Sequence, residues 1–201
     1  MSKLCVPHPA EALILARVPE AVRKRAARVR VMAFDIDGVL TDGSLWYGEH
    51  GETVKRFNVL DGQGLRLLAA SGVAVAFITA RDGAMVTRRA ADLGIKHVVQ
   101  GSHDKAEALQ TLVQKLGLTA EDAGFMGDDV NDLPAMRQAG FAVTVPAAPS
   151  YVAQAAHWTT ERAGGSGAAR EVCDLILAAQ GRLGAVLSQG SRVVAAGGSL
   201  Q

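Results

Sequence analysis

Two aspartates that directly follow an apolar segment constrain this chain more than any other feature. The segment 31–34 reads Val-Met-Ala-Phe, a pattern typical of a strand buried on both faces of a parallel sheet. Ligands bind at the carboxyl ends of strands in open α/β sheets, and side chains two residues apart on an extended chain point the same way. We therefore expect Asp35 and Asp37 to face one site.

Such a carboxylate pair has a chemical interpretation and a purely structural one. Unpaired carboxylates repel, and the pKa of one rises, whereas a divalent cation keeps both ionised. Asp35 would then be a nucleophile and Asp37 a proton donor and acceptor beside a bound Mg2+. The alternative is a turn in which an aspartate caps the loop and Gly38 supplies a positive φ. Three elements further along the chain favour the chemical interpretation.

The rest of the chain alternates short apolar segments with amphipathic ones. This alternation predicts βαβ units and a doubly wound, Rossmann-like α/β domain with a parallel sheet covered on both faces. A β-hairpin insertion is expected at 44–57, where aromatic and β-branched residues flank a glycine-rich centre. Strands are expected at 31–35, 73–79, 97–100, 124–127, 142–145 and 158–159, and helices at 64–70, 83–92, 105–116, 131–139 and 151–155.

The chain is expected to have three parts. Residues 1–30 would be an N-terminal helical extension in which a basic amphipathic helix is interrupted at Pro19, and residues 31–183 would be the main domain. Within that domain a glycine-rich loop at 162–171 opens the final helix. Residues 184–201 are rich in Gly, Ser and Ala, and we expect a flexible tail there.

The composition argues against several classes of protein. The formal net charge is +1, with 21 basic and 20 acidic residues, which does not indicate a nucleic-acid or membrane partner. No apolar run approaches the roughly 18 residues of a membrane span, and no secretory signal pattern opens the chain, so we expect a cytoplasmic protein. Cys5 and Cys173 are far apart and indicate neither a disulfide framework nor a zinc site; Cys173 is expected to be a core thiol.

Two further residues stand where an anion would bind. Thr79 ends the second apolar strand, so its hydroxyl would bind a phosphate oxygen beside the free amides of a helix start. Alternatively, it caps the helix that begins near Asp82. Lys105 opens a helix, where a cation is unfavourable toward the helix dipole unless it turns toward an anion and toward Asp35. Alternatively, it is a solvated surface lysine.

The segment 124–132, Gly-Phe-Met-Gly-Asp-Asp-Val-Asn-Asp, repeats the arrangement of the first motif. A short strand ends at Gly127 and carboxylates follow it. Asp128 would complete the metal site, and Asp132 would hold the metal's water shell or orient Lys105. Mg2+ prefers near-octahedral oxygen coordination and keeps several waters, so two direct carboxylates and one carbonyl would be sufficient.

Taken in order, these motifs resemble the haloacid dehalogenase superfamily of phosphotransferases, over about residues 31–177. The matching motifs are Asp-Ile-Asp-Gly-Val-Leu-Thr-Asp at 35–42, the strand-ending Thr79, the helix-opening Lys105 and Gly-Asp-Asp-Val-Asn-Asp at 127–132. Within the superfamily, an aspartate two residues after the nucleophile favours phosphatases over P-type ATPases and dehalogenases. The resemblance therefore implies a phosphoester hydrolase.

The resemblance also implies a role for each motif residue. Asp35 would attack phosphorus to form an aspartyl-phosphate, and Asp37 would protonate the leaving alcohol and then activate the hydrolytic water. Thr79 and Lys105 would hold the phosphoryl oxygens. Mg2+ would bind Asp35, the backbone carbonyl of Asp37 and Asp128.

Many members of the superfamily carry a cap domain, for which this chain leaves no room. Only the hairpin fits after the first motif, and one helix plus one strand fills the interval between Thr79 and Lys105. The chain is thus similar to the capless 3-deoxy-D-manno-octulosonate (KDO) 8-phosphate phosphatases, which it also resembles at 57–64, 78–81 and 163–173. This implies a Mg2+-dependent enzyme of lipopolysaccharide biosynthesis. It also implies a homotetramer in which hairpins build a central barrel and the tail reaches a neighbour's active site.

A sugar-acid substrate would also need cations that bind its carboxylate. Arg81 and Arg170 are the candidates, with Lys55 or Arg56 as additional ones, because arginine binds a carboxylate through two parallel hydrogen bonds. Alternatively, Arg170 caps a helix or pairs with Glu171.

Other functions stay open at this point. The family usually has arginine where this chain has Leu60 and Ser166. Related capless phosphatases act on nine-carbon 2-keto sugar acids, such as the 9-phosphates of KDN or sialic acid, and a generalist sugar phosphatase is a further alternative. A catalytically inactive oligomeric module is the non-enzyme alternative, against which the full set of motif residues argues.

Overall fold

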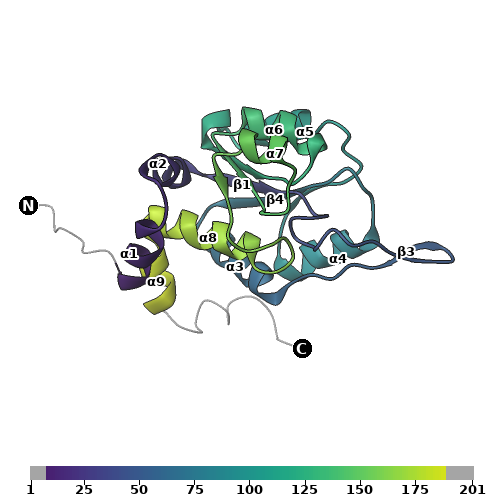
Figure 1. The fold of residues 1–201 in the computed structure, drawn as a ribbon, viewed down its shortest axis with the longest axis horizontal. Coiled ribbons are helices and arrows are strands. Elements are labelled where there is room, and N and C mark those ends of the chain that lie inside the picture. The colour runs from purple at the N-terminus through teal and green to yellow at the C-terminus, as the bar shows by residue number, and fades with distance from the viewer. Residues whose placement is uncertain (1–7, 189–201) are drawn as a thin grey trace, which may run out of the picture.

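Six parallel strands in the order β5-β4-β1-β6-β7-β8 form the centre of the computed structural model, which describes residues 8–188 (Figure 1). Helices cover both faces, so the predicted doubly wound α/β fold is confirmed. The strands lie close to their expected positions. Their bounds are β1 Val31–Phe34, β4 Ala74–Ile78, β5 His97–Val99, β6 Ala123–Met126, β7 Phe141–Thr144 and β8 Trp158–Thr159.

The helices form two layers. In Figure 1, α5, α6 and α7 lie on one side of the sheet, and α3, α4 and α8 lie on the other. Two 3-10 turns, Ala120–Asp122 and Val130–Asp132, flank β6. The helix bounds are α3 Val59–Ala70, α4 Ala84–Leu93, α5 Lys105–Lys115, α6 Leu133–Gln138, α7 Ser150–Ala155 and α8 Ala168–Ala179.

Strand β1 is the point at which the chain changes direction across the sheet. It pairs with β4 on one side and β6 on the other, with Val31 opposite both Ala74 and Ala123. After β1 the chain builds β4 and β5 outward, then crosses back to add β6, β7 and β8. Such a switch point opens a crevice at the carboxyl ends of the strands, which brings the loops after β1, β4 and β6 together.

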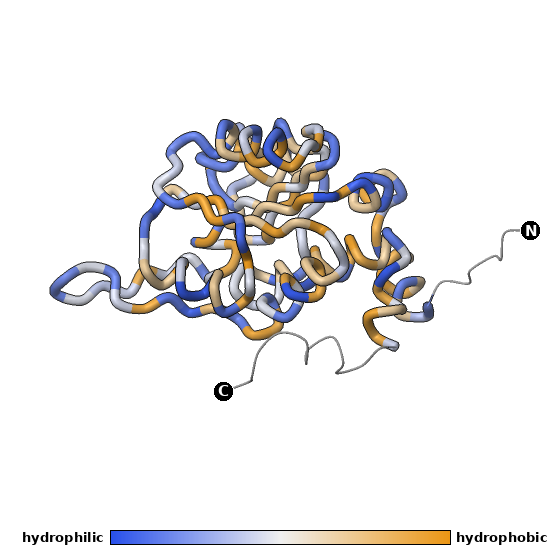
Figure 2. Tube along the Cα trace, turned by 180° about the vertical axis from the view of Figure 1, so that it is seen from behind, coloured by the Kyte–Doolittle hydropathy of each residue, from blue (hydrophilic) through white to orange (hydrophobic). Residues whose placement is uncertain are grey.

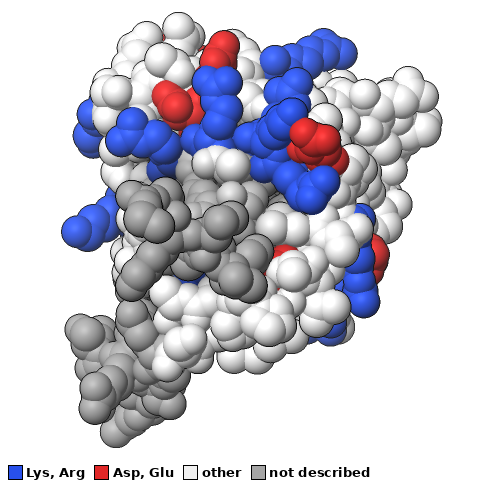
Figure 3. Space-filling model, turned by 90° about the vertical axis from the view of Figure 1, so that its left-hand side faces the viewer, with Lys and Arg blue, Asp and Glu red and all other residues white. Residues whose placement is uncertain are grey.

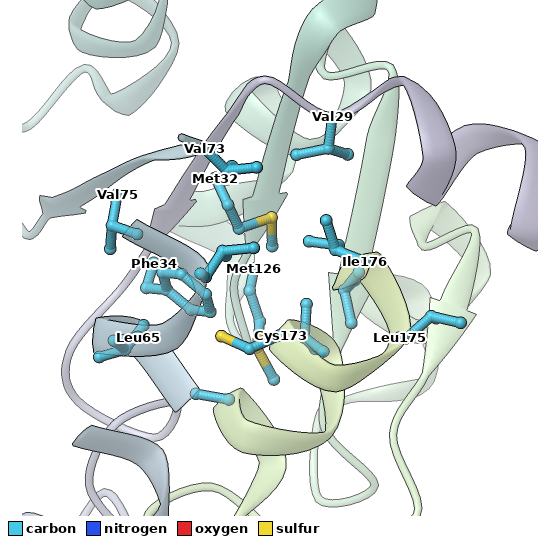
Figure 4. Close-up of a cluster of buried hydrophobic side chains, with 14 of the residues drawn as sticks. Val29, Met32, Phe34, Leu65, Val73, Val75, Met126, Cys173, Leu175 and Ile176 are labelled. Atoms are coloured by element: carbon cyan, nitrogen blue, oxygen red, sulfur yellow. The ribbon is translucent and has the colours of Figure 1, made fainter. Parts of the chain in front are cut away.

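The alternating side chains of β1 supply both halves of the core. Met32 and Phe34 face the layer of α3 and α8, whereas Val31 and Ala33 face the layer of α5 and α6, and all four are fully buried. Figure 4 shows the first of these clusters, with Leu65, Met126, Cys173 and Ile176 packed around Met32 and Phe34. Cys173 is the expected core thiol, and burial raises its pKa. Cys5 lies outside the described residues.

A two-stranded antiparallel hairpin, β2 Trp46–Gly48 and β3 Gly51–Val54, interrupts the αβ alternation between β1 and α3 as predicted. It projects away from the sheet (Figure 1), and its tip is hydrophilic (Figure 2). Between β1 and α8 the described residues contain no cap domain; the hairpin is the insertion in this part of the chain.

The N-terminal helices pack into the main core. Helices α1 Pro9–Ala16 and α2 Glu20–Arg28 are divided near Pro19 as expected. Val18, Val22 and Ala26 join the same buried cluster as Met32. The outer side of α2 is strongly basic, and Lys and Arg side chains gather on this face of the molecule (Figure 3).

The expected flexible tail does not begin at Gly184, because Leu183–Ser188 forms a further helix, α9. Leu183 and Gly184 are buried, and the amide of Gly184 donates to Glu11 at 2.8 Å. The contact between α1 and α9 thus extends the ordered domain; residues 189–201 lie outside the described part. None of the helices between residues 8 and 188 is long and apolar enough to cross a bilayer.

Candidate active site

The loop after β1 is a tight turn that aims two aspartates at the crevice. The amide of Asp35 continues the sheet ladder by donating to Met126 at 2.9 Å, and the carbonyl of Ile36 then accepts from three amides of the turn. Gly38 has φ +85°, and a Cβ there would overlap the carboxylate of Asp128. The turn expected from Gly38 is therefore present, and it brings the loop of β1 against the loop of β6.

Lys105 is a buried cation directed at the nucleophile candidate, not a surface lysine. Its Nζ lies 2.9 Å from Asp35 Oδ1 and 2.6 Å from Asp132 Oδ1, and its side chain is 4% exposed. Burial alone would lower the pKa of Lys105, but the charges of Asp35 and Asp132 outweigh it and raise that pKa. Lys105 is therefore charged at neutral pH.

Three carboxylates crowd together at the edge of the sheet. One oxygen each from Asp35, Asp128 and Asp132 lies within 4.8 Å of the others. Burial and then the charge of Asp132 raise the pKa of Asp35 to about 7, although Lys105 opposes this. Burial and then the charge of Asp35 also raise the pKa of Asp128 to about 7. The cluster holds more negative charge than Lys105 neutralises.

The donor set at this cluster fits a divalent cation. Asp128 Oδ1 is buried and has no hydrogen-bond partner within residues 8–188. Both oxygens of Asp132 are occupied, one by Lys105 and the other by the amides of Asp128 and Asp129 at 2.9 and 3.2 Å. Asp35 and Asp128 therefore have oxygens to offer a hard cation, while the contacts of Asp132 are those of a residue that orients Lys105.

Thr79 lies at the same crevice. It is buried, its Oγ1 accepts from the amide of Arg81 at 3.3 Å, and its own amide donates to Val99 at 3.0 Å. It does not cap the following helix, because the N-cap of α4 is Gly83, whose amide donates to Gln100 Oε1 at 2.9 Å. The crevice is a cavity of about 290 Å³ lined by the five motif residues Asp35, Asp37, Thr79, Lys105 and Asp128, together with Arg81 and Asp132.

A second charged network surrounds Asp37, and the hairpin supplies most of it. Lys55 Nζ contacts Asp37 Oδ1 and lies 2.7 Å from Glu52 Oε1. Arg81 lies 2.9 Å from Glu52 Oε2 and 3.6 Å from Asp37 Oδ2, and Tyr47 Oη is 3.1 Å from its Nη2. The hydrogen bonds with Tyr47 and Glu52 raise the pKa of Arg81.

Sequence reasoning missed Glu52 altogether and gave Lys55 a different role. Lys55 was a candidate for a substrate carboxylate, but the structure places it on Asp37. Glu52 and Lys55 stand three residues apart next to an expected hairpin, which is a weak signal. Only the position of the hairpin against the β1 loop reveals their common partner.

Arg170 does not reach this crevice within one chain. Its Nε pairs with both oxygens of Asp174 at 2.8 Å, and it lines a different cavity of about 440 Å³ that also includes Leu60. The alternative partner Glu171 instead accepts from the amides of Glu161 and Arg162. The partner of Arg170 in the structure is thus Asp174, in an i,i+4 ion pair on α8.

The glycine-rich loop before α8 packs behind the β1 loop. The amide of Gly165 donates to Val39 at 3.0 Å, and a Cβ on Gly164 would overlap the carbonyl oxygen of Gly38. Asp61, buried on α3, accepts from the amides of Gly167 and Arg170 at 3.2 and 2.9 Å. This loop therefore supports the turn after β1 from within the same chain.

Comparison with known proteins finds relatives among the haloacid dehalogenase-like hydrolases. A family model for haloacid dehalogenase-like hydrolases matches residues 93–172. The chain is 43% identical to the 3-deoxy-D-manno-octulosonate 8-phosphate phosphatase of Escherichia coli (strain B / BL21-DE3) over 162 residues, which is 81% of this chain and 86% of the relative.

Solved structures agree with this sequence match. The phosphatase of the same name from Yersinia pestis has a TM-score of 0.81 at 44% identity and covers 83% of this chain and 90% of its own. The phosphatase from Moraxella catarrhalis has a TM-score of 0.82 at 42% identity and covers 84% and 97%. The crystal structure of the latter holds a magnesium ion, a phosphate ion and a KDO molecule.

The charge of the cluster predicts how stability depends on pH and metal. Because the pKa values of Asp35 and Asp128 are raised, the folded protein binds more protons than the unfolded chain between about pH 4 and about pH 7. Without metal, stability should therefore fall as the pH rises through this window. We expect Asp128→Asn to raise the metal-free Tm at pH 7.5 by about 3–8 °C, because each kcal/mol of relieved repulsion shifts Tm by about 2–4 °C.

Calorimetry from pH 5 to 8, in EDTA and in Mg2+, measures this dependence. Asp128→Asn should also lose most of the rise in Tm that Mg2+ gives the wild type. Glu20→Gln, which changes an exposed carboxylate on α2, is the control and should behave as the wild type. A metal-free protein whose stability increases between pH 5 and pH 7 would contradict the charge analysis.

Proposed function

Because the chain belongs to the haloacid dehalogenase-like hydrolases, in the family of the 3-deoxy-D-manno-octulosonate 8-phosphate phosphatases, we propose that it hydrolyses KDO 8-phosphate to KDO and phosphate with Mg2+. One observation carries the proposal: the buried contact of Lys105 with Asp35, beside the unpartnered carboxylate oxygen of Asp128. The Moraxella catarrhalis relative, which holds KDO, phosphate and magnesium, supports the choice of substrate and metal.

In the proposed first step, Asp35 attacks phosphorus while the bond from phosphorus to the sugar oxygen breaks. Lys105 and Thr79 line the same cavity as Asp35 and carry the donors that would bind the phosphoryl oxygens. Because such transition states spread charge over those oxygens, placed donors contribute most of the stabilisation. In the second step, water attacks the aspartyl-phosphate and releases phosphate and the free Asp35.

Asp37 is proposed to move the protons of both steps. It would give a proton to the leaving sugar oxygen and later take one from the attacking water. Its side chain lies at the cavity and keeps 20% exposure, which allows contact with both the alcohol and water. Asp35 and Asp37 line the same cavity, which supports their action on one substrate.

Asp35, Asp128 and the backbone carbonyl of Asp37 are the proposed ligands of Mg2+. The pKa values of Asp35 and Asp128 are raised, and a bound cation would lower them because it favours the ionised carboxylates. When bound, the ion supplies positive charge that keeps the nucleophile ionised and offsets the charge of the phosphoryl group. Asp132 keeps its contact with Lys105 and supports the site from behind.

Substrate recognition is proposed to involve Arg81 from the same chain and Arg170 from a neighbouring subunit. Arg81 lines the cavity and is 39% exposed, so part of its guanidinium faces outward. Arg170 lies in another cavity of its own chain, and only an assembly would bring it to a substrate. We accordingly propose a homotetramer joined through the hairpins.

The proposed nucleophile has a direct test. Asp35→Asn should lower turnover of p-nitrophenyl phosphate with Mg2+ by at least about three orders of magnitude, because the amide cannot form the covalent intermediate. Asp92→Asn on α4 is the matched surface control. Near-normal turnover by a folded Asp35→Asn protein would refute the assignment.

The substrate is tested with a panel of phosphate esters. Steady-state kinetics with Mg2+ should give KDO 8-phosphate a kcat/KM at least about tenfold above KDN 9-phosphate and simple sugar phosphates, since a site matched to polar groups discriminates strongly. A preference for KDN 9-phosphate would favour the nine-carbon acids. A flat profile would indicate a generalist phosphatase.

The assembly is tested by light scattering. Trp46, Tyr47 and Val54 on the hairpin are 58%, 63% and 50% exposed. Large apolar side chains gathered on one exposed element are typical of a surface that another subunit covers. We expect a tetramer at micromolar concentration, and we expect Trp46→Glu to reduce the mass by placing a charge in the contact. Lys24→Glu on α2 should leave the mass unchanged. A monomeric wild type at that concentration would rule out the tetramer.

A further inference from the structure

We infer that Lys55 and Glu52 are positioning residues that hold Asp37 in the orientation needed to give its proton to the leaving alcohol. The inference rests on the proposed function, because it takes Asp37 as the acid and base of a phosphatase. It assigns a chemical task to the hairpin, in addition to any part it has in assembly.

Lys55 approaches Asp37 from behind the cavity. Its side chain is 3% exposed, against 20% for Asp37. Among the described residues that line the cavity, Asp37 and Arg81 are present but neither Lys55 nor Glu52 is. A substrate in the cavity would therefore meet Asp37 first. The ammonium of Lys55 is placed to hold a protein side chain.

The four charged groups form a closed ring. Lys55 contacts Asp37 Oδ1 and lies 2.7 Å from Glu52 Oε1. Glu52 Oε2 lies 2.9 Å from Arg81, whose Nε lies 3.6 Å from Asp37 Oδ2. Because each cation stands between two carboxylates, Glu52 fixes both Lys55 and Arg81 and through them the plane of the Asp37 carboxylate.

The two oxygens of Asp37 are consequently unequal. Oδ1 is held by Lys55, whereas Oδ2 is buried and accepts no hydrogen bond from residues 8–188. A general acid must lie within about 2.6–3.2 Å of the atom that it protonates, so a fixed carboxylate whose Oδ2 has only the 3.6 Å ion-pair contact with Arg81 is suited to the task. The geometry points to Oδ2 as the atom that carries the proton to the ester oxygen.

The ring is separate from the contacts that would bind phosphate. Lys105 and Asp132 surround the nucleophile Asp35, and none of the ring members is their partner. Loss of the ring should therefore impair departure of the alcohol and not phosphate binding. This separation makes the inference testable with two esters that differ only in how much their leaving group needs a proton.

The experiment compares p-nitrophenyl phosphate, whose leaving group departs without a proton, with glycerol 2-phosphate, an alkyl ester without a carboxylate. Lys55→Met and Glu52→Gln should lower kcat/KM for glycerol 2-phosphate by about 30-fold or more, because loss of positioning removes a large part of the roughly 10²–10⁴-fold that a general acid contributes. The same variants should change kcat/KM for p-nitrophenyl phosphate by less than about threefold. Lys55→Arg should restore part of the loss because it keeps the cation.

Two further variants serve as controls. Asp37→Ala should show the same split between the two esters in a stronger form. Glu49→Gln, at the exposed tip of the hairpin, should match the wild type. Thermal melts and light scattering on every variant establish that fold and assembly are retained.

The outcomes separate the inference from the function on which it rests. Equal losses for both esters in Lys55→Met, or no loss for either, would overturn the inference while Asp37→Ala still shows the split. Absence of the split in Asp37→Ala would overturn the proton-transfer role of Asp37 itself, and the inference with it. A split in Asp37→Ala, Lys55→Met and Glu52→Gln alike supports both.

Discussion

Repulsion among the buried carboxylates at the end of β1 and β6 is the constraint on which the rest of the site depends. Asp35, Asp128 and Asp132 are held close together by a rigid parallel sheet, and Lys105 offsets only part of their charge. A flexible scaffold would relax and separate them. The fully buried strand β1 prevents that, so the excess charge persists and remains available to a cation.

Two carboxylates separated by one residue acquire different tasks because different elements surround them. Asp35 faces a buried lysine from α5 and the carboxylates of the β6 loop, while Asp37 faces Lys55 from the hairpin and Arg81 from the loop after β4. In the proposed mechanism, environment and not residue type would thus separate the nucleophile from the acid and base. The short hairpin brings charged groups to the second carboxylate without enclosing the cavity.

The sequence was sufficient for the parts of the site that depend on strand ends. Thr79 and Asp128 follow apolar strands of a parallel sheet, so topology alone brings them to Asp35. Glu52 was not predictable, because an ordinary hairpin glutamate has no assigned partner until the hairpin is placed. Helix α9 was missed for a similar reason: its Gly- and Ala-containing composition hides that Leu183 packs into the core.

The ion pair between Arg170 and Asp174 bears on which groups one chain supplies to the cavity. The groups proposed for bond breaking lie in one chain around one cavity, whereas Arg170 lies in a different cavity and is already neutralised by an i,i+4 carboxylate. A single chain therefore contains the groups proposed for bond breaking, and Arg81 lines their cavity. The exposed hairpin aromatics, and the absence of a cap domain from the part of the chain that the structure describes, fit the proposed assembly, in which further contacts to a sugar acid would come from a second copy. In the proposed assembly, the fold of one chain would supply the groups for bond breaking, and a neighbouring copy would supply part of the substrate selection.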